Sequence, residues 1–355
     1  MRTEKLLRDY QAQAKPFCQR FFSDWKKQAK KTNKLSLKII DRFARFYPKG
    51  KQHRGALVVL GYQLAEGRNK RDILQASLLV ELFHTAILIA DDVFDEDEKR
   101  RGGLTIHRQW EKHFKIKGLA LKQSYGRNMA LTTTIIGLYL APLALAKTGF
   151  SPQLKQKVFN YFFSRMVYLG WGEALDISVP FQKLAEKKNS ARMIHDLKTV
   201  DYSAVVPLHL GALLAGKGEG KWLNSLDRYG VCLGRIFQVQ DDIIGSFGDP
   251  QKTGKANESD LKGARWTILI EILWQKANTQ DRKLLKQLFE KNKRTAKEII
   301  KIKSLMRKYQ VMTKARKKAE KYFQQAVKIV PRISRNKGDE ETLINLLKFM
   351  LERTR

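Results

Sequence analysis

Cysteine is scarce in this 355-residue chain, which contains only Cys18 and Cys232. The two lie far apart and lack the spacing of a metal site, so the sequence argues against a disulfide framework. This cysteine usage favours a reducing compartment, and we expect a cytoplasmic protein. Proline and glycine are also sparse, at 8 and 23 residues. Long stretches without either residue favour helices over many short strands.

Long apolar runs are rare as well. The first residues mix charged and apolar side chains and lack the uninterrupted apolar core of a signal peptide. One segment, 128–146, is uncharged and nearly long enough to cross a bilayer. It contains three threonines and Pro142, and we find no apolar partner segment elsewhere. We therefore interpret it as a helix in a large helical core.

Acidic residues are few relative to basic ones. The chain has 35 Asp and Glu against 69 Lys and Arg, a formal net charge of +34. Such an excess attracts polyanions, including nucleic acid, anionic lipid head groups and phosphorylated metabolites. A solubilising surface explains the same excess, so charge alone does not choose the partner.

Apolar periodicity accounts for most of the remaining sequence. With 43% hydrophobic residues, the chain can bury a sizeable core. No boundary resembles a flexible linker, so we predict one all-helical domain over residues 1–355. We expect two or three helices between 280 and 333 and a charged loop at 96–103. The predicted helical segments are 4–30, 35–46, 56–64, 72–92, 120–147, 152–170, 190–215, 222–246, 260–275, 280–333 and 339–352.

An acidic cluster ends the apolar stretch 72–92. Asp91 and Asp95 are four residues apart and Asp92 and Asp95 three apart, so a helix presents all three on nearly one face. Like charges repel there, at a helix end whose dipole is already negative. Magnesium prefers oxygen ligands and would offset this repulsion. The basic triplet 99–101 follows directly and suits a diphosphate bound beside the metal, although a frayed acidic end with surface ion pairs is the alternative.

A second cluster repeats the pattern. The apolar stretch 222–246 ends in Asp241 and Asp242, and Gln238 lies three residues before Asp241 on the same face. The glycine-rich segment that follows brings backbone N–H groups and Lys255 to phosphate oxygens. Two acidic helix ends facing each other across a bundle would hold several metal ions and a diphosphate.

These residues resemble the trans-prenyltransferase family, the head-to-tail isoprenyl diphosphate synthases, over roughly residues 45–270. The family elements that match are DDxxD at 91–95, RRG at 100–102, KT at 198–199, GQxxD at 172–176, FQxxDD at 237–242 and the FGD and KTGK segments at 247–255.

The chain departs from the family pattern in several places. The GGKRxRP element reads KGKQHRG at 49–55, where Lys51 and Arg54 are retained. The last aspartate of the second motif is Gly245, which leaves one metal with fewer carboxylates. Two further replacements are Glu173 for the glutamine of GQxxD and Arg265 for a lysine after the second motif.

The resemblance implies an isoprenoid synthase-type bundle of antiparallel helices around a deep central cavity. It also implies a magnesium-dependent transferase that ionises an allylic diphosphate and adds isopentenyl diphosphate, with three Mg²⁺ ions. The implied metal ligands are Asp91, Asp92, Asp95, Asp241 and Asp242. The implied catalytic side chains are Asp91, Asp95, Lys198, Thr199, Gln238 and Asp241. The implied substrate-binding side chains are Lys51, Arg54, His84, Arg100, Arg101, Lys198, Gln238, Lys255 and Arg265.

Substrates, product and partners follow from the same resemblance. The allylic substrate would be dimethylallyl, geranyl or farnesyl diphosphate. Ala86 and Ile87, one turn before Asp91, would form the cavity floor, and the small Ala86 predicts a product of C20 or longer, unless Phe83 one turn further is the floor. We also expect a homodimer and peripheral contact with anionic membrane.

Two alternatives remain at this point. A class I terpene cyclase shares the helical bundle and an acidic cluster but uses one diphosphate substrate, and the altered segment 49–55 keeps it open. A basic nucleic-acid- or membrane-surface-binding protein explains the charge but leaves both acidic clusters unexplained. We therefore do not expect nucleic acid as the main partner.

Overall fold

The structure is a computed structural model that describes residues 2–47, 50–182, 187, 189–248, 259–263, 265–289, 291 and 294–353. The chain separates into two compact units. One unit holds residues 1–160 and 210–218, and the other holds residues 161–209 and 219–355. The single domain over 1–355 stays a prediction.

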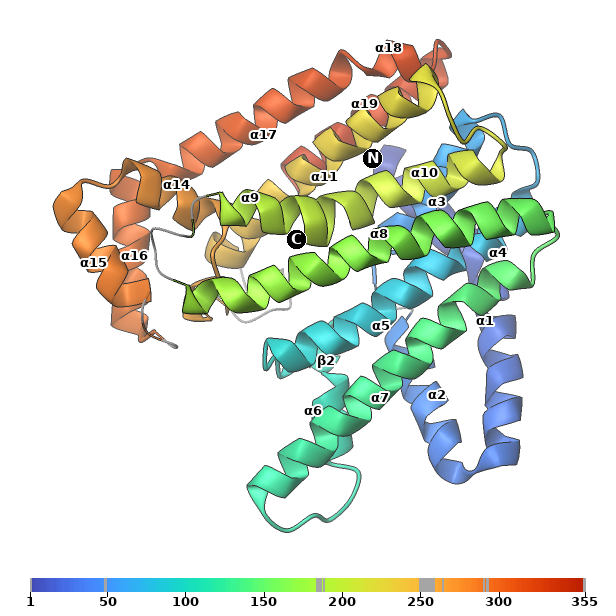
Figure 1. The fold of residues 1–355 in the computed structure, drawn as a ribbon, viewed down its shortest axis with the longest axis horizontal. Helices are drawn as coiled ribbons and strands as arrows, with labels where there is room; N and C mark the ends of the chain where they lie inside the picture. Colours follow the sequence, from blue (N-terminus) through green and yellow to red (C-terminus); the bar gives the residue numbers. More distant parts are fainter. Residues whose placement is uncertain are drawn as a thin grey trace. The chain divides into compact units, whose positions relative to one another are not determined.

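The first unit is helical, with α5 packed along α7 and α1 paired with α2 (Figure 1). The Asn33 side chain starts α2 by accepting the Ser36 N–H at 2.8 Å. Gly137 allows the close approach of α5 and α7, because a Cβ there would lie 2.8 Å from the Cβ of Ala86. Its helices are α1 (Arg2–Thr32), α2 (Lys34–Phe46), α3 (His53–Leu64), α4 (Lys70–Ala76), α5 (Leu78–Phe94), α6 (Ile106–Glu111) and α7 (Leu119–Ala146).

The second unit is built around α11, which packs against η4, α17 and α19. Its core includes Leu269 and Leu273 of α14 and Ile299 and Ile302 of α16. Two helices, α8 and α10, contain residues of both units. The helices from α8 onward are α8 (Pro152–Ser178), η2 (Val179–Phe181), α9 (Ser190–Ile194), η4 (His195–Val205), α10 (Val206–Leu214), α11 (Lys221–Phe247), α13 (Ser259–Lys262), α14 (Ile268–Lys276), α15 (Thr279–Phe289), α16 (Ala296–Lys308), α17 (Val311–Val327), α18 (Val330–Ile333) and α19 (Lys337–Glu352).

The helical class is confirmed, while several predicted boundaries are wrong. The stretch 72–92 divides at Ser77, whose hydroxyl donates to the Leu74 carbonyl at 2.7 Å. The described residues of the stretch 280–333 form four helices rather than two or three. The predicted loop 96–103 contains two antiparallel strands of two residues, β1 (Lys99–Arg100) and β2 (Gly103–Leu104).

Within the part of the chain that the structure describes, two helical segments are long and apolar enough to cross a membrane by composition, Lys70–Phe94 and Leu119–Ala146. The expectation that the second has no apolar counterpart is therefore wrong. In the most apolar windows, 78% of the first segment and 44% of the second are buried inside the structure. Core helices of soluble proteins pass the same test, so the two segments are weak support for a membrane span.

Candidate active site

The first acidic cluster lies at the C-terminal end of α5. Asp91 and Asp92 occupy its last turn, and Asp95 is the residue that ends the helix. The Arg100 side chain from β1 lies over them: Nη2 is 3.2 Å from Asp91 Oδ2 and 3.0 Å from Asp97 Oδ2, and Nε contacts Asp92 Oδ1. A buried guanidinium therefore balances Asp91 and Asp92, two of the three carboxylates that the sequence predicts on one helix face.

Asp92 differs from its neighbours because its side chain is fully buried. Burial raises the pKa of this carboxyl to about 7, although the adjacent Arg100 opposes the rise. Its Oδ2 atom is buried without a hydrogen-bond partner. An unsatisfied buried carboxylate oxygen is costly, and a cation would relieve that cost.

Basic side chains gather beneath this cluster. Arg101 Nη1 donates to the Phe46 carbonyl at 2.8 Å, and its guanidinium lies 4.9 Å from the Phe46 ring centre. Burial lowers the pKa of Arg101 to about 10, still far above neutrality. Burial also lowers the pKa of His84, and the charges of Arg54 and Arg101 lower it further. The His84 imidazole is therefore neutral at pH 7, with one ring nitrogen able to donate a hydrogen bond and the other able to accept one.

The second acidic cluster occupies the C-terminal end of α11. Asp242 is 3% exposed, and both its oxygens have partners. Oδ1 accepts the Gln238 amide at 2.8 Å, while Oδ2 accepts the Ile268 N–H at 2.9 Å and lies 3.1 Å from His195 Nε2. Burial opposes protonation of His195, but Asp242, helped by the charges of Asp196 and Asp176, outweighs burial and raises the pKa of His195. Asp242 joins α11, α14 and η4, which suits an orienting residue better than a direct metal ligand.

Asp241 is the open member of this pair. Its side chain is 46% exposed, and Oδ1 lies 2.9 Å from Arg353 Nη2. The Gln240 amide donates to the Arg353 carbonyl at 2.6 Å and fixes the backbone there. Arg353 therefore forms an ion pair with Asp241, as Arg100 does with Asp91. Arg353 and Asp241 are 112 residues apart, and no sequence pattern predicts their contact.

The position of the missing motif aspartate is filled from elsewhere. A Cβ at Gly245 would lie 2.1 Å from Asp260 Oδ2. Asp260, at the start of α13, also lies 3.3 Å from Arg265 Nη1. Where the family has an aspartate side chain at 245, this chain has glycine, and the Asp260 carboxylate occupies the adjacent space beside the α11 backbone.

Lys198 and Thr199 lie in η4, a π-helix that the sequence did not predict. Such wide turns often occur at functional sites. Two glycines let α8 and α11 pack closely against η4. A Cβ at Gly172 of α8 would lie 2.7 Å from the backbone nitrogen of Lys198, and a Cβ at Gly234 of α11 would lie 2.8 Å from Val200 Cα. The ammonium of Lys198 lies 2.9 Å from Glu173 and 2.8 Å from Asp176, so the GQxxD segment holds it.

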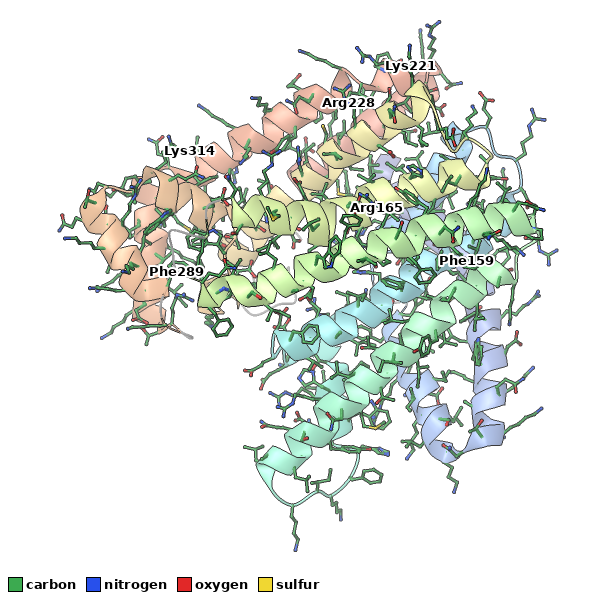
Figure 2. The ribbon with its side chains drawn as sticks, viewed as in Figure 1. Phe159, Arg165, Lys221, Arg228, Phe289 and Lys314 are labelled. Carbon is green, nitrogen blue, oxygen red and sulfur yellow. The ribbon has the colours of Figure 1, made fainter. Side chains whose placement is uncertain are left out.

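A partly exposed ion pair links η4 to α8. Arg165 of α8, labelled in Figure 2, donates from Nε to Asp201 Oδ2 at 2.9 Å. A second hydrogen bond joins Nη2 to Oδ1, which makes the pair bidentate. This pairing joins α8 to η4 three residues after Lys198.

The structure distributes the predicted residues over both units. Lys51, Arg54, His84, Asp91, Asp92, Asp95, Arg100 and Arg101 belong to the first unit, and Lys198, Thr199, Gln238, Asp241, Asp242 and Arg265 belong to the second. Lys255 lies outside the described residues. The sequence missed Asp97, His195 and Arg353; only Asp97, inside the acidic run after Asp95, had a local signal.

One expectation about the cavity floor is wrong. Ala86 is fully buried and packs at the seam of α5 and α7, where its Cβ would be 2.8 Å from a Cβ at Gly137. A larger side chain at 86 would meet α7 rather than an open space. Ile87 is the partly exposed residue of the two. Ala86 therefore gives no support for product length.

The carboxylates are suitable donors for a hard divalent cation, because each acidic helix end offers oxygen ligands. Among the described residues, no three acidic, histidine or cysteine side chains already converge on one point. Arginine groups lie on Asp91, Asp92 and Asp241 instead. The donor chemistry and the unsatisfied Asp92 oxygen nevertheless fit a metal that binds together with a phosphate ligand.

The sequence is similar to those of known prenyl diphosphate synthases. The chain is 28% identical over 323 residues to a geranylgeranyl diphosphate synthase of Saccharolobus solfataricus, covering 88% of this chain and 89% of that protein. It is 25% identical over 285 residues to a geranylgeranyl diphosphate synthase of Sulfolobus acidocaldarius, covering 80% and 81%.

The fold matches a crystal structure of a geranylgeranyl pyrophosphate synthase from Corynebacterium glutamicum, complexed with isoprenyl diphosphate and magnesium. The TM-score is 0.87 at 21% identity, over 99% of both chains. The predicted isoprenoid synthase fold is thereby confirmed. A family model described as polyprenyl synthetase matches residues 38–308. This match confirms the predicted prenyltransferase and disfavours both alternatives, and the chain therefore belongs to the polyprenyl synthetase family.

Proposed function

We propose that this polyprenyl synthetase joins an allylic diphosphate head to tail with isopentenyl diphosphate and releases a trans-polyprenyl diphosphate of C20 or longer. The observation that carries the proposal is the pair of acidic helix ends, each balanced by an arginine that a metal and a diphosphate can displace. The product length is supported by the names of the two archaeal relatives and by a geranylfarnesyl diphosphate synthase of Aeropyrum pernix, 25% identical.

Three Mg²⁺ ions are part of the proposal. Asp91 and Asp95 would hold two and Asp241 the third, while Asp92 and Asp242 orient them. When bound, Mg²⁺ supplies Lewis-acid stabilisation of the negative charge on the departing diphosphate. The exposed Asp241 and the unsatisfied oxygen of Asp92 support these assignments.

The cationic side chains divide between two diphosphates. Arg100 in the first unit and Lys198 in the second are proposed diphosphate ligands, as is Lys255, and such positive charges stabilise an allylic diphosphate as it leaves. Release from Asp91 and Asp92 lets the Arg100 guanidinium turn to phosphate oxygens. The Lys198 ammonium is already held by Glu173 and Asp176, so it is oriented before substrate arrives.

In this proposal, isopentenyl diphosphate binds to basic side chains of the first unit. Lys51, Arg54 and Arg101 supply charge, and the neutral His84 supplies a hydrogen bond. Arg265 is a further diphosphate ligand of the second unit. The dipoles of Thr199 and Gln238 favour the allylic cation that remains after ionisation.

Product analysis tests the function. The purified chain is incubated with Mg²⁺ and dimethylallyl, geranyl or farnesyl diphosphate, with and without isopentenyl diphosphate. We expect chain elongation only when isopentenyl diphosphate is present, and no turnover after chelation. Cyclised hydrocarbon from an allylic diphosphate alone would instead identify a terpene cyclase.

We also propose a homodimer. Phe163, Val167 and Trp171 lie four residues apart on α8 and are 39%, 51% and 58% exposed. Three exposed apolar side chains on one helix face are typical of a contact surface. The variant Trp171→Glu should shift the mass measured by light scattering toward one chain, and an unchanged mass would refute this surface.

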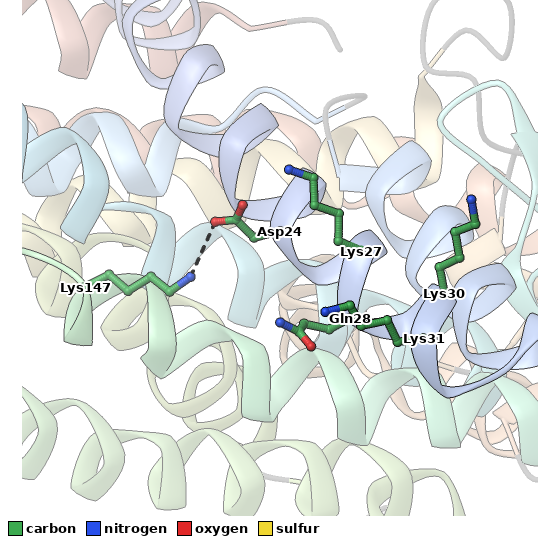
Figure 3. A pocket seen from close by; sticks show the side chains of 6 residues that line it. All are labelled: Asp24, Lys27, Gln28, Lys30, Lys31 and Lys147. Carbon is green, nitrogen blue, oxygen red and sulfur yellow. Dashed lines mark ion pairs between the residues drawn. The ribbon is translucent and has the colours of Figure 1, made fainter.

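Peripheral contact with anionic membrane is the last partner we propose. A groove of about 690 Å³ is lined by four lysines, three of them on α1, and by Asp24, which lies 3.7 Å from Lys147 (Figure 3). No motif residue lines it. Charge complementarity supports anionic lipid here. Sedimentation with phosphatidylserine vesicles, but not with phosphatidylcholine vesicles, is the expected result, and equal sedimentation with both contradicts it.

A further inference from the structure

Glu81 is a buried acid that none of the family motifs includes. It lies in the first turn of α5, ten residues before Asp91, and is 4% exposed. A carboxylate is rarely buried so deeply unless specific partners hold it. Its partners therefore indicate what it does.

Those partners are the first backbone amides of α3. Glu81 Oε1 accepts the Gly55 N–H at 2.7 Å, and the carboxylate also accepts the Arg54 N–H. The residue that precedes α3, Gln52, has a left-handed backbone and makes no side-chain capping bond. Because the first N–H groups of a helix need acceptors, Glu81 acts as the cap of α3 from a distant helix.

The same carboxylate lies within electrostatic range of two arginines. Burial raises the pKa of Glu81, while the charges of Arg54 and Arg101 oppose that rise. Arg101 is held from the other side by the Phe46 carbonyl at 2.8 Å. Glu81 thus contacts the backbone of one predicted diphosphate ligand and attracts the side chains of both.

The replacement of the family's proline by Gly55 makes this arrangement possible. Proline has no N–H to donate, so the bond to Glu81 could not form. A Cβ at Gly55 would also lie 1.9 Å from Tyr10 Oη, and that hydroxyl hydrogen-bonds Ser77 Oγ at 2.8 Å. Tyr10 of α1 fills the space that a proline ring would need.

We propose that Glu81 is a positioning residue for isopentenyl diphosphate: it caps α3 and sets the direction of Arg54 and Arg101. The inference rests on the proposed function, because it concerns one of the two substrates of that reaction. Substrate contact stays with the arginines, and Glu81 acts through them. Tyr10 and Gly55 form the packed wall that keeps the carboxylate dry.

Steady-state kinetics of Glu81→Gln tests the inference. This variant has nearly the same shape, keeps one acceptor oxygen and removes the charge. We expect the KM for isopentenyl diphosphate to rise about tenfold, as for loss of one charge-assisted hydrogen bond. The KM for the allylic diphosphate should change less than about twofold.

Glu271→Gln is the matched control. Glu271 is also 4% exposed and accepts a backbone amide, that of Ala191 at 3.2 Å, but it lies in the second unit. Both variants should lower the melting temperature, and only Glu81→Gln should change the KM for isopentenyl diphosphate. An unchanged KM in Glu81→Gln, or an equal rise for both substrates, overturns the inference.

Direct binding separates this inference from the proposed function. Calorimetry with isopentenyl diphosphate should give a tenfold weaker Kd for Glu81→Gln than for the wild-type chain, with Glu271→Gln unchanged. A wild-type chain that neither binds nor consumes isopentenyl diphosphate refutes the proposed function itself. A wild-type chain that does both, beside a Glu81→Gln variant with the same Kd, refutes only the positioning role.

Discussion

Restoring the family aspartate at Gly245 should harm this chain rather than improve it. The change Gly245→Asp completes the DDxxD pattern of the second motif. A Cβ at this position would lie 2.1 Å from Asp260 Oδ2 and 3.0 Å from its Cγ. The Asp260 side chain is only 13% exposed and is paired with Arg265, so it cannot move away without losing that pair.

The destabilisation has two parts. Overpacking at a close contact costs about 1–3 kcal/mol. Two carboxylates about 5 Å apart repel by about 3 kcal/mol at an effective dielectric constant of about 20, which Arg265 and nearby solvent reduce to about 1–2 kcal/mol. Together they predict a loss of roughly 2–5 kcal/mol. At about 1–2 °C for each kcal/mol in a chain of this length, the melting temperature should fall by roughly 2–10 °C.

Four variants separate the two parts by thermal unfolding at a fixed scan rate. Gly245→Ala carries only the steric part and should fall less than Gly245→Asp. Asp260→Ala removes the obstructing carboxylate. The double variant Gly245→Asp/Asp260→Ala should be more stable than the sum of the single changes predicts, by at least about 1 kcal/mol. A Gly245→Asp variant as stable as the wild-type chain, or a double variant with additive losses, would refute this account of the glycine.

Three further predictions concern other contacts. Arg353→Ala removes the cation from Asp241, so the Mg²⁺ concentration for half-maximal activity should fall about two- to fivefold; a titration that shows no change contradicts the pairing. Glu173→Gln removes one of the two carboxylates that pair with Lys198. The KM for the allylic diphosphate should then fall about two- to fivefold, because the Lys198 charge is less neutralised. An increased KM would count against this pairing. Burial raises the pKa of the Cys18 thiol to about 12, so at pH 8 about one thiol in ten thousand is the reactive thiolate; iodoacetamide should label Cys18 in the native chain far more slowly than after unfolding, and equal rates would refute the burial.

The sequence predicted helix positions closely wherever the apolar pattern was long and a glycine or a capping side chain marked an end of the helix. The predicted helix 222–246 is observed as α11, Lys221–Phe247, and ends at Gly248. The predicted helix 35–46 is α2, Lys34–Phe46, which Asn33 begins. Both boundaries depend on local chemistry, namely a glycine and a capping side chain, and local chemistry is readable from a single sequence.

The π-helix η4 was invisible for a different reason. Its residues lie within the predicted helix 190–215, and nothing in their periodicity separates wide turns from ordinary ones. The wide turns lie where α8 and α11 approach closely at Gly172 and Gly234. Lys198 and Thr199 could therefore be named as candidates, but their setting depends on neighbours far away in sequence.

The sequence by itself determined the helical class, the two acidic helix ends, the basic segments beside them and the family. Each of these depends on residues within a few turns of one another, where spacing along the chain fixes spacing in space. Only the tertiary structure decided which carboxylate is open and which is buried, that Arg353 pairs with Asp241, that Asp260 approaches Gly245, and that Glu81 caps α3. Those pairings join segments 15 to 112 residues apart, and packing rather than periodicity brings them together.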